Sequence, residues 1–314
     1  MPKNLRRTLI CGTAALLPAA AIGFAATANA TPAAKAAGGS FPAHYSAPYL
    51  QISSSDAGDL AKDMAASGDK FYTLAFLTPK SGCTPQWEDG GDSVGAFSSQ
   101  ITALQNAGGN VIISFGGASG GELAEKCTSV SSLEAAYAKV VSTYHVTRLD
   151  FDIEGTDLNN KTANSRRNQA LAALQKANPS VQVDYTLPVD PTGLESNATT
   201  LLKDAKSKGV AVKVVNIMTM DFGDGQNALN DAESAAKATA PQLQSIFGQS
   251  WGMLGLTPIA GHNDDNENFT QSNASTLESF AASHGVQELA FWEVDGYDKG
   301  TGYAYSKIFN KITG

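Results

Sequence analysis

The feature that most constrains the fold is an alternation of apolar, β-rich runs with helix-like segments along most of the chain. The runs span residues 45–52, 71–77, 110–115, 148–154, 181–189, 212–220, 254–260 and 288–294. Segments with apolar residues three and four apart, typical of helices, span 56–66, 100–107, 133–144, 163–177, 201–208, 228–247, 275–283 and 305–312. Strands alternating with helices form a parallel sheet, and eight such units favour a closed (β/α)8 barrel, the TIM barrel, over an open doubly wound sheet.

A single domain is expected over residues 40–314, because no linker rich in proline or serine and no change in composition divides this part of the chain. The segment between the seventh run and the eighth is too short to hold an inserted domain. The barrel is therefore expected to have no insertion domain at that point.

The N-terminal residues 1–30 have the features of a secretory signal peptide. Basic residues precede an apolar stretch over 9–26, and the small-x-small triplet Ala28-Asn29-Ala30 follows it. The pair Arg6-Arg7 leaves a twin-arginine export signal as an alternative. Residues 31–39 are mostly Ala, Gly and Thr and are expected to form a flexible leader. These features predict a secreted protein.

Charge and cysteine content indicate which partners the protein can bind and whether it contains a disulfide. The chain has 22 Lys and Arg against 30 Asp and Glu, a net charge of −8, so it is a poor partner for nucleic acid or an anionic membrane. We expect a monomer. Outside the predicted signal only Cys83 and Cys127 remain, and in an exported protein such a pair most simply forms a disulfide. Two buried free thiols are the alternative.

Three carboxylates occupy alternate positions of the fourth run. Asp150, Asp152 and Glu154 share one face of the predicted strand, with apolar residues between them on the other face. The strand ends at Gly155, so Glu154 is expected at the carboxyl-end rim of the barrel, where active sites of this fold lie, and Asp150 deepest inside it. Crowding and partial burial favour a protonated Glu154 that can act as a general acid.

Other interpretations of these acids are open at this point. The segment 150–155 matches the start of an EF-hand calcium loop, but Lys161 stands where that loop needs a glutamate. A divalent metal held by the carboxylates and a purely structural acidic cluster are further alternatives.

A rival motif is the segment 117–121, which fits G-x-S-x-G, the nucleophile elbow of serine hydrolases, with Ser119 as nucleophile. Asp221 or Asp264 with His262 or His284 could complete that triad. The three acids on the fourth strand would then have no role.

Several segments resemble motifs of glycoside hydrolase family 18, the chitinase family, over essentially all of the chain from residue 45 onward. They are 111–117, similar to S-x-G-G on the third strand; 149–154, similar to D-x-D-x-E on the fourth; 216–222, similar to M-x-Y-D on the sixth; and 290–293 on the eighth, with a tryptophan under the scissile sugar. The acid motif is the most specific of these.

The resemblance implies a retaining mechanism in which the N-acetyl group of the substrate is the nucleophile. Glu154 would protonate the glycosidic oxygen and later activate water, Asp152 would stabilise the oxazolinium intermediate, and Asp150 would tune the charge of Asp152. The resemblance implies no metal and no cofactor. It also implies a set of residues around the bound sugar: Ser114, Gly117, Met218, Met220, Asp221, Asn263, Trp292, Tyr49, Phe76 and Tyr185.

The sequence departs from the family pattern in two places. Thr147 stands where the family has a further acid, and Met220 replaces a tyrosine whose hydroxyl would orient the acetamido oxygen. We hypothesise that Tyr185 or Tyr297 supplies the missing donor.

The expected activity is that of a secreted chitinase that cleaves β-1,4 bonds between N-acetylglucosamine units, with chitin or chito-oligosaccharides as its partners. The missing insertion suggests an open cleft and internal cleavage. The alternatives are an endo-β-N-acetylglucosaminidase that acts on N-glycans and a non-catalytic chitin-binding protein with the same barrel.

Overall fold

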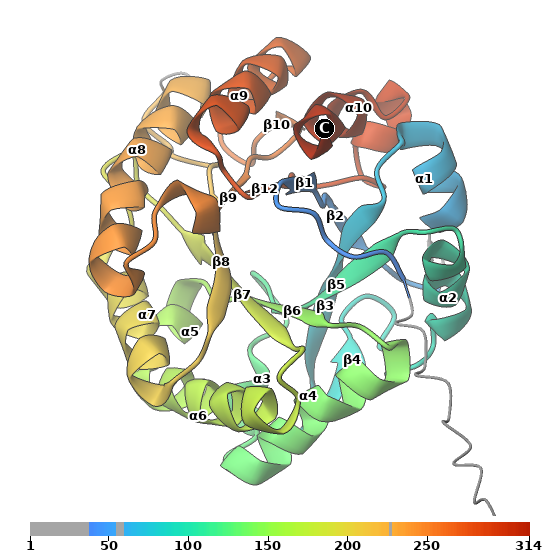
Figure 1. The fold of residues 1–314 in the computed structure, drawn as a ribbon, viewed down its shortest axis with the longest axis vertical. Helices are drawn as coiled ribbons and strands as arrows, with labels where there is room; N and C mark the ends of the chain where they lie inside the picture. Colours follow the sequence, from blue (N-terminus) through green and yellow to red (C-terminus); the bar gives the residue numbers. More distant parts are fainter. Residues whose placement is uncertain (1–37, 55–59, 226–227) are drawn as a thin grey trace, which may run out of the picture. The chain divides into compact units, whose positions relative to one another are not determined.

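The computed structural model describes residues 38–54, 60–225 and 228–314. The predicted signal peptide and most of the predicted leader lie outside the described residues, as do residues 56–59 of the first predicted helix. Within the described ranges, helices surround a ring of strands (Figure 1). No helix described there combines the length and the apolar character that crossing a lipid bilayer requires.

The strands of the barrel occur in the predicted places and are mostly parallel. They are β1 (Tyr45–Ser46), β2 (Tyr49–Gln51), β3 (Phe71–Ser81), β5 (Asn110–Gly116), β6 (Arg148–Asp152), β7 (Gln182–Pro188), β8 (Val212–Met218), β9 (Leu254–Thr257) and β12 (Glu288–Leu289). The sheet order is β1-β12-β9-β8-β7-β6-β5-β3-β2. Because β1 and β2 belong to one run of the chain, interrupted at Ala47-Pro48, that run joins the two ends of the sheet. The predicted (β/α)8 barrel is confirmed.

The predicted helices are found with shifted ends. They are α1 (Leu60–Ser67), α2 (Ser98–Asn106), α4 (Val130–Tyr144), α6 (Lys161–Ala177), α7 (Ser196–Lys208), α8 (Ala228–Phe247), α9 (Gln271–His284) and α10 (Ala304–Phe309), the last followed by the short turn η3 (Asn310–Thr313). Short helices α3 (Leu123–Lys126) and α5 (Gly155–Asn159) and the strand β4 (Thr84–Trp87), antiparallel to β3, were not predicted. Between β9 and β12 the chain forms only the hairpin β10 (Gly261–His262) and β11 (Asn268–Phe269), followed by α9, as predicted from the short spacing.

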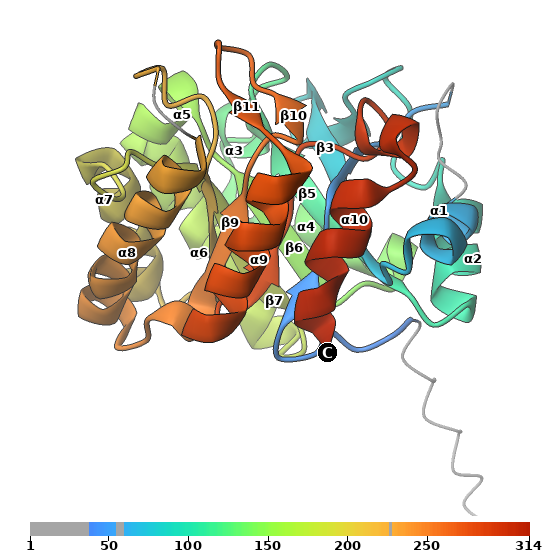
Figure 2. The same ribbon diagram turned by 90° about the horizontal axis from the view of Figure 1, so that it is seen from above.

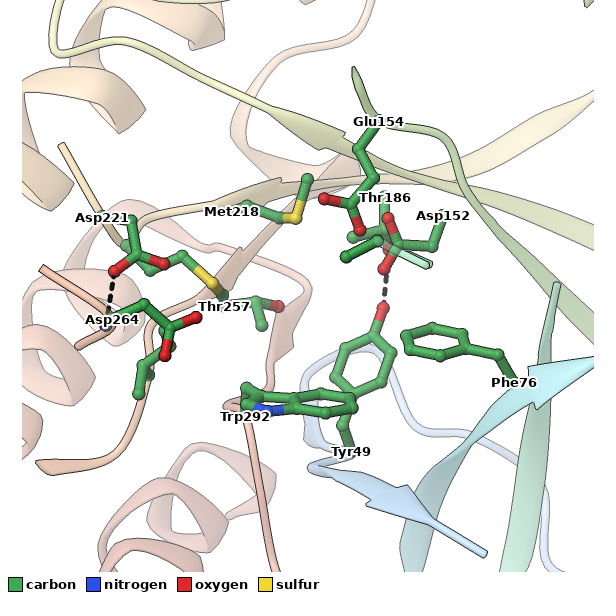
Figure 3. A pocket seen from close by; sticks show the side chains of 13 residues that line it. Tyr49, Phe76, Asp152, Glu154, Thr186, Met218, Asp221, Thr257, Asp264 and Trp292 are labelled. Carbon is green, nitrogen blue, oxygen red and sulfur yellow. Dashed lines mark hydrogen bonds between the residues drawn. The ribbon is translucent and has the colours of Figure 1, made fainter. Parts of the chain in front are cut away.

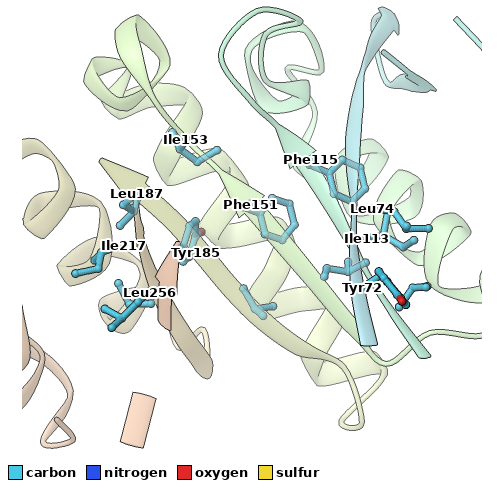
Figure 4. Close-up of a cluster of buried hydrophobic side chains, with 14 of the residues drawn as sticks. Tyr72, Leu74, Ile113, Phe115, Phe151, Ile153, Tyr185, Leu187, Ile217 and Leu256 are labelled. Carbon is cyan, nitrogen blue, oxygen red and sulfur yellow. The ribbon is translucent and has the colours of Figure 1, made fainter. Parts of the chain in front are cut away.

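The two faces of β6 have different surroundings. One packs into the hydrophobic core under the helices, and the other faces the interior of the barrel. Phe151 is fully buried between the strands and the helices, with its ring 5.3 Å from Phe115 and 5.1 Å from Tyr137. Tyr185 of β7 lies in this same outer layer, 5.9 Å from Phe151 (Figure 4). Since side chains alternate along a strand, Asp150 and Asp152 face the interior of the barrel.

A disulfide joins Cys83, in the turn between β3 and β4, to Cys127, which ends α3, with their Cα atoms 4.5 Å apart. The predicted pairing is confirmed, and the alternative of two free thiols is wrong. The bond ties the turn between β3 and β4 to the end of α3. Figure 2 shows α3 at the same end of the barrel as α5, which follows β6.

Candidate active site

A pocket of about 260 Å³ opens at the carboxyl ends of the strands. Its lining combines acids, aromatic rings and two methionines: Tyr49, Phe76, Ala118, Asp152, Glu154, Thr186, Met218, Met220, Asp221, Thr257, Ile259, Asp264 and Trp292 (Figure 3). Most of the residues predicted for the site line this pocket, and those that do not are Asp150, Ser114, Gly117, Asn263 and Tyr185.

Asp150 lies beneath the pocket and is only 3% exposed. Its carboxylate accepts hydrogen bonds from the Ser114 hydroxyl at 2.6 Å, from Thr186 at 2.8 Å and from Tyr49 at 3.1 Å. Burial nevertheless raises the pKa of Asp150 from 3.8 to about 7, because desolvation outweighs the stabilisation of the anion by these hydroxyl groups. Asp150 is a fully hydrogen-bonded support below the site.

Asp152 ends β6 and is 5% exposed at the pocket wall. Its Oδ1 atom is buried without a hydrogen-bond partner. Burial is the main cause of a pKa raised well above the ordinary value for Asp152, and the charges of Glu154 and Asp150 raise it further. Asp152 thus offers an acceptor to a donor that a ligand would bring.

Glu154 follows β6 at the rim and stands at the N-terminal end of α5. Its side chain is half-buried and faces the pocket beside Asp152 (Figure 3). The pKa of Glu154 is raised, first by burial and then by the nearby acids Glu88 and Asp157. A carboxyl group with a raised pKa at the mouth of a pocket has the properties of a general acid.

Glu88 is a residue that sequence reasoning missed. It follows β4, and its carboxylate accepts a hydrogen bond from the Ser119 hydroxyl. No motif marks it, since the β3–β4 hairpin that brings it toward Glu154 was not predicted.

Aromatic rings form the base of the pocket. Trp292 and Phe76 are stacked with their ring centroids 5.6 Å apart and their planes at 8°. Tyr49 lies 6.0 Å from each of them. Cis peptide bonds occur at Ala75–Phe76 and Trp292–Glu293. The structure thus places Trp292, Phe76 and Tyr49 in the pocket, as predicted, with an apolar face of the kind on which sugar rings stack.

Ser114 and Gly117 were assigned to the bound sugar, but neither lines the pocket. Ser114 is fully buried and hydrogen-bonds Asp150. Gly117 has a φ of +87°, and a Cβ atom there would lie 2.6 Å from the Phe76 ring. At Gly116 a Cβ atom would lie 2.0 Å from the carbonyl oxygen of Asp152. This motif therefore positions the acids and the aromatic base by close approach.

The opposite wall of the pocket joins two loops. Asp221, which has a φ of +51°, accepts the backbone N–H of Asp264 at 2.8 Å and that of Asp265 at 3.4 Å. Burial raises the pKa of Asp221. Asn263 is only 6% exposed and does not line the pocket, whereas the neighbouring Asp264 does.

The hypothesis that Tyr185 or Tyr297 replaces the missing tyrosine is wrong. The Tyr185 hydroxyl donates to Asn168 of α6 in the outer layer, on the far side of the sheet from the pocket. Tyr297 is 40% exposed, packs beside Tyr305 and does not line the pocket. Met218 and Met220 do line it, so the position of the missing tyrosine is apolar.

Two rival interpretations also fail. Ser119 donates its hydroxyl hydrogen to Glu88 and not to His262 or His284, as a serine nucleophile would need. His284 lies against Trp251 and Phe280 on the outside of the barrel. Residues 155–159 form α5, so the chain after Gly155 cannot wrap an ion as an EF-hand loop does.

The barrel, its line of acids and its aromatic base define a protein of the glycoside hydrolase type. Crystal structures of a chitinase from Pyrococcus furiosus, one of them of catalytic site mutants with chito-oligosaccharides, are 33% identical and superpose with a TM-score of 0.80. Each superposition covers 88% of this chain. It covers 97% of the chain of the catalytic domain and 96% of the chain of the mutant with chito-oligosaccharides. The chain belongs to glycoside hydrolase family 18, the chitinase family.

Two curated relatives support this assignment. They are a probable bifunctional chitinase/lysozyme of Escherichia coli and endochitinase 11 of Metarhizium anisopliae, each 33% identical over 81% of this chain. The chain spans only 31% and 52% of their respective lengths. No protein-family model matches the sequence.

Proposed function

We propose that this protein is a chitinase that hydrolyses β-1,4 bonds between N-acetylglucosamine units, with Glu154 as general acid and base. The observation that carries the proposal is the pairing of Glu154 at the rim with a buried Asp152 whose Oδ1 atom has no protein partner. The Pyrococcus relative crystallised with chito-oligosaccharides supports the substrate class.

The unpartnered oxygen of Asp152 suits the acetamido N–H of the substrate. A buried acceptor without a partner costs about 1–3 kcal/mol, and a ligand that donates to it recovers that free energy. A negative charge on Asp152 would then stabilise a positive oxazolinium ion directly beside it. A hexose without an N-acetyl group has neither the acetamido N–H nor the acetamido oxygen that would act as the nucleophile.

The proposed reaction has two steps. First, Glu154 gives its proton to the glycosidic oxygen while the acetamido oxygen attacks the anomeric carbon, so the glycosidic bond breaks and an oxazolinium ion forms. Second, water attacks the same carbon, Glu154 takes a proton from that water, and the ring of the intermediate opens. Two inversions at one carbon give net retention of configuration.

The protonation states around Glu154 favour this sequence. The pKa of Asp150 lies near neutrality, and the pKa values of Asp152 and Glu154 are both raised, so the three acids are not all ionised at neutral pH. The raised pKa of Glu154, beside the acids Glu88 and Asp157, favours the protonated form that the first step needs. Trp292 would lie under the sugar at the reacting centre.

The hairpin between β9 and β12 leaves the rim without an inserted domain, which suits a shallow cleft and internal cleavage. The test is the product distribution on a long soluble chito-oligosaccharide, where release of only dimers from one end would contradict internal cleavage. We also propose that residues 1–30 direct export, which N-terminal sequencing of protein recovered from the culture medium would test.

The activity is tested with chito-oligosaccharides and a high-mannose glycopeptide, each incubated with the wild-type chain, with Glu154→Gln and with the control Glu278→Gln on α9. We expect cleavage of the chito-oligosaccharides, reduced about 10²- to 10⁴-fold in Glu154→Gln and unchanged in the control. Cleavage of the glycopeptide alone would show an endo-β-N-acetylglucosaminidase. Binding to chitin without any cleavage would show a chitin-binding protein.

A further inference from the structure

A second group of acids lies behind the wall of the pocket. Asp224 lies between β8 and α8, Asp231 lies in the first turn of α8, and Glu267 lies directly before β11. One carboxylate oxygen from each residue lies within 4.8 Å of the others. We call these three residues the acid cluster. Figure 2 shows the segments that carry them at the same end of the barrel.

Two members of the acid cluster are buried and have carboxylate oxygens without hydrogen-bond partners. Asp231 is 6% exposed and Glu267 is 4% exposed. The Oδ2 atom of Asp231 and both carboxylate oxygens of Glu267 accept no hydrogen bond. The backbone N–H of Phe222 faces Glu267 without reaching hydrogen-bond geometry. Buried carboxylates are normally paired or bound to a metal, so these oxygens point to a missing positive partner.

The charges around the acid cluster do not supply that partner. Burial is the main cause of the raised pKa of Asp231, and Asp224 adds to it. Burial is also the main cause for Glu267, whose pKa Asp265, Asp224 and Asp231 raise further. The charged side chains that mainly shift these two pKa values are all acids. The positive end of α8 favours a negative Asp231, but Glu267 lies outside that helix.

The geometry points to a hard divalent cation, and we propose that the acid cluster binds Ca²⁺. Oxygen atoms bound to Ca²⁺ lie about 2.3–2.6 Å from the ion, so two ligands on opposite sides are about 5 Å apart, which accommodates the separation here. With only oxygen ligands in the cluster, zinc and copper are disfavoured. Ligands from two loops and a helix also suit the flexible coordination of Ca²⁺ better than the strict octahedron of Mg²⁺.

The ion would hold together the two loops that form one wall of the pocket. The backbone N–H of Gly223 donates to Asp265 at 3.0 Å, and the N–H of Asp264 donates to Asp221 at 2.8 Å. Figure 3 shows Asp221 and Asp264 meeting at that wall. An ion bound to Asp224 and Glu267 would cross-link the same pair of loops a few residues further out. The proposed ion is therefore structural and takes no part in the bond-breaking steps.

The test is calorimetric titration of the metal-free chain with Ca²⁺ and, separately, with Mg²⁺, together with thermal unfolding in chelator and in Ca²⁺. The variants are Glu267→Gln and Asp231→Asn, and Glu278→Gln is the control that removes one carboxylate elsewhere. We expect one Ca²⁺ per wild-type and control chain, a higher Tm in Ca²⁺, and at least tenfold weaker binding in both cluster variants.

The sign of the change in Tm separates a metal site from a protonated acid cluster. In chelator, Glu267→Gln should have a Tm equal to or above that of the wild-type chain, because it removes repulsion between acids. In Ca²⁺ the Tm of the wild-type chain should be above that of Glu267→Gln. Stronger binding of Mg²⁺ than of Ca²⁺ would overturn the choice of ion. A wild-type chain that binds neither ion would overturn the proposal, whatever its activity on chito-oligosaccharides, so the two proposals fail independently.

Discussion

Replacing Ser114 by alanine tests how the barrel holds its deepest acid. The Ser114 hydroxyl donates to Asp150 at 2.6 Å, and both side chains are buried. A hydrogen bond to an ionised group contributes about 1.5–3 kcal/mol, whereas a bond between neutral groups contributes about 0.5–1.5 kcal/mol. Ser114→Ala should therefore cost more free energy of unfolding when Asp150 is ionised than when it is protonated.

The pH dependence follows from the pKa of Asp150. Its folded value of about 7 lies above the unfolded value, so the stability linked to its proton is fully present below about pH 4 and is lost as the pH rises through about 7. Without the Ser114 hydroxyl the folded pKa should rise by about 1, because the two contributions differ by about 1 to 1.5 kcal/mol and 1.36 kcal/mol corresponds to about one pKa unit. The loss of stability in Ser114→Ala should therefore grow between about pH 6 and about pH 9.

The measurement is urea unfolding of the wild-type chain and of Ser114→Ala at several values across that pH range. Tyr185→Phe is the matched control, since it removes a buried hydrogen bond to the neutral Asn168 side chain, and its cost should not change with pH. A cost of Ser114→Ala that is the same at both ends of the range would refute the reasoning, since the Ser114 bond would then not act on the ionised form of Asp150.

Three further predictions concern the rim. Trp292→Ala should raise KM for chito-oligosaccharides about tenfold or more through loss of the stacking surface, while Tyr297→Ala, an exposed aromatic outside the pocket, should leave KM unchanged in steady-state kinetics. Glu88→Gln removes a charge that raises the pKa of Glu154, so the alkaline limb of the kcat/KM profile should move to lower pH; an unmoved limb would mean that Glu154 does not control it. Cys127→Ser should lose about 4 kcal/mol in urea unfolding, because the disulfide closes a loop of 44 residues, and reductant should lower the Tm of the wild-type chain but not that of the variant.

The barrel and the line of acids could be predicted because both follow from the spacing of apolar and polar residues along the sequence. Eight buried strands stand out as apolar runs, and the alternation in 150–154 fixes which side chains share a face. Alternation along a strand did not predict on which side of the sheet Tyr185 lies. Which face of β7 lines the barrel interior depends on the register between β7 and β6. The structure pairs Tyr185 with Phe151, and both side chains point toward the helices.

Features made by several loops could not be read from the sequence. Glu88 approaches Glu154 only through the β3–β4 hairpin, whose strands were not recognised as a pair. The acid cluster brings together Asp224, Asp231 and Glu267 from three separate segments, with no spacing typical of a metal site. The prediction of no metal followed from the resemblance to the family and stays a prediction, since motifs do not register contacts between distant loops.

The most direct test of the proposed mechanism is the configuration of the first product. Hydrolysis of a soluble chito-oligosaccharide is followed by proton NMR before the new reducing end equilibrates between its anomers. If Glu154 and Asp152 support attack by the acetamido group, the new reducing end appears first as the β-anomer, and it forms about 10²- to 10⁴-fold more slowly in Glu154→Gln. An α-anomer at the earliest times would mean direct attack by water with inversion, and would contradict the account of Asp152 as the group that stabilises an oxazolinium ion.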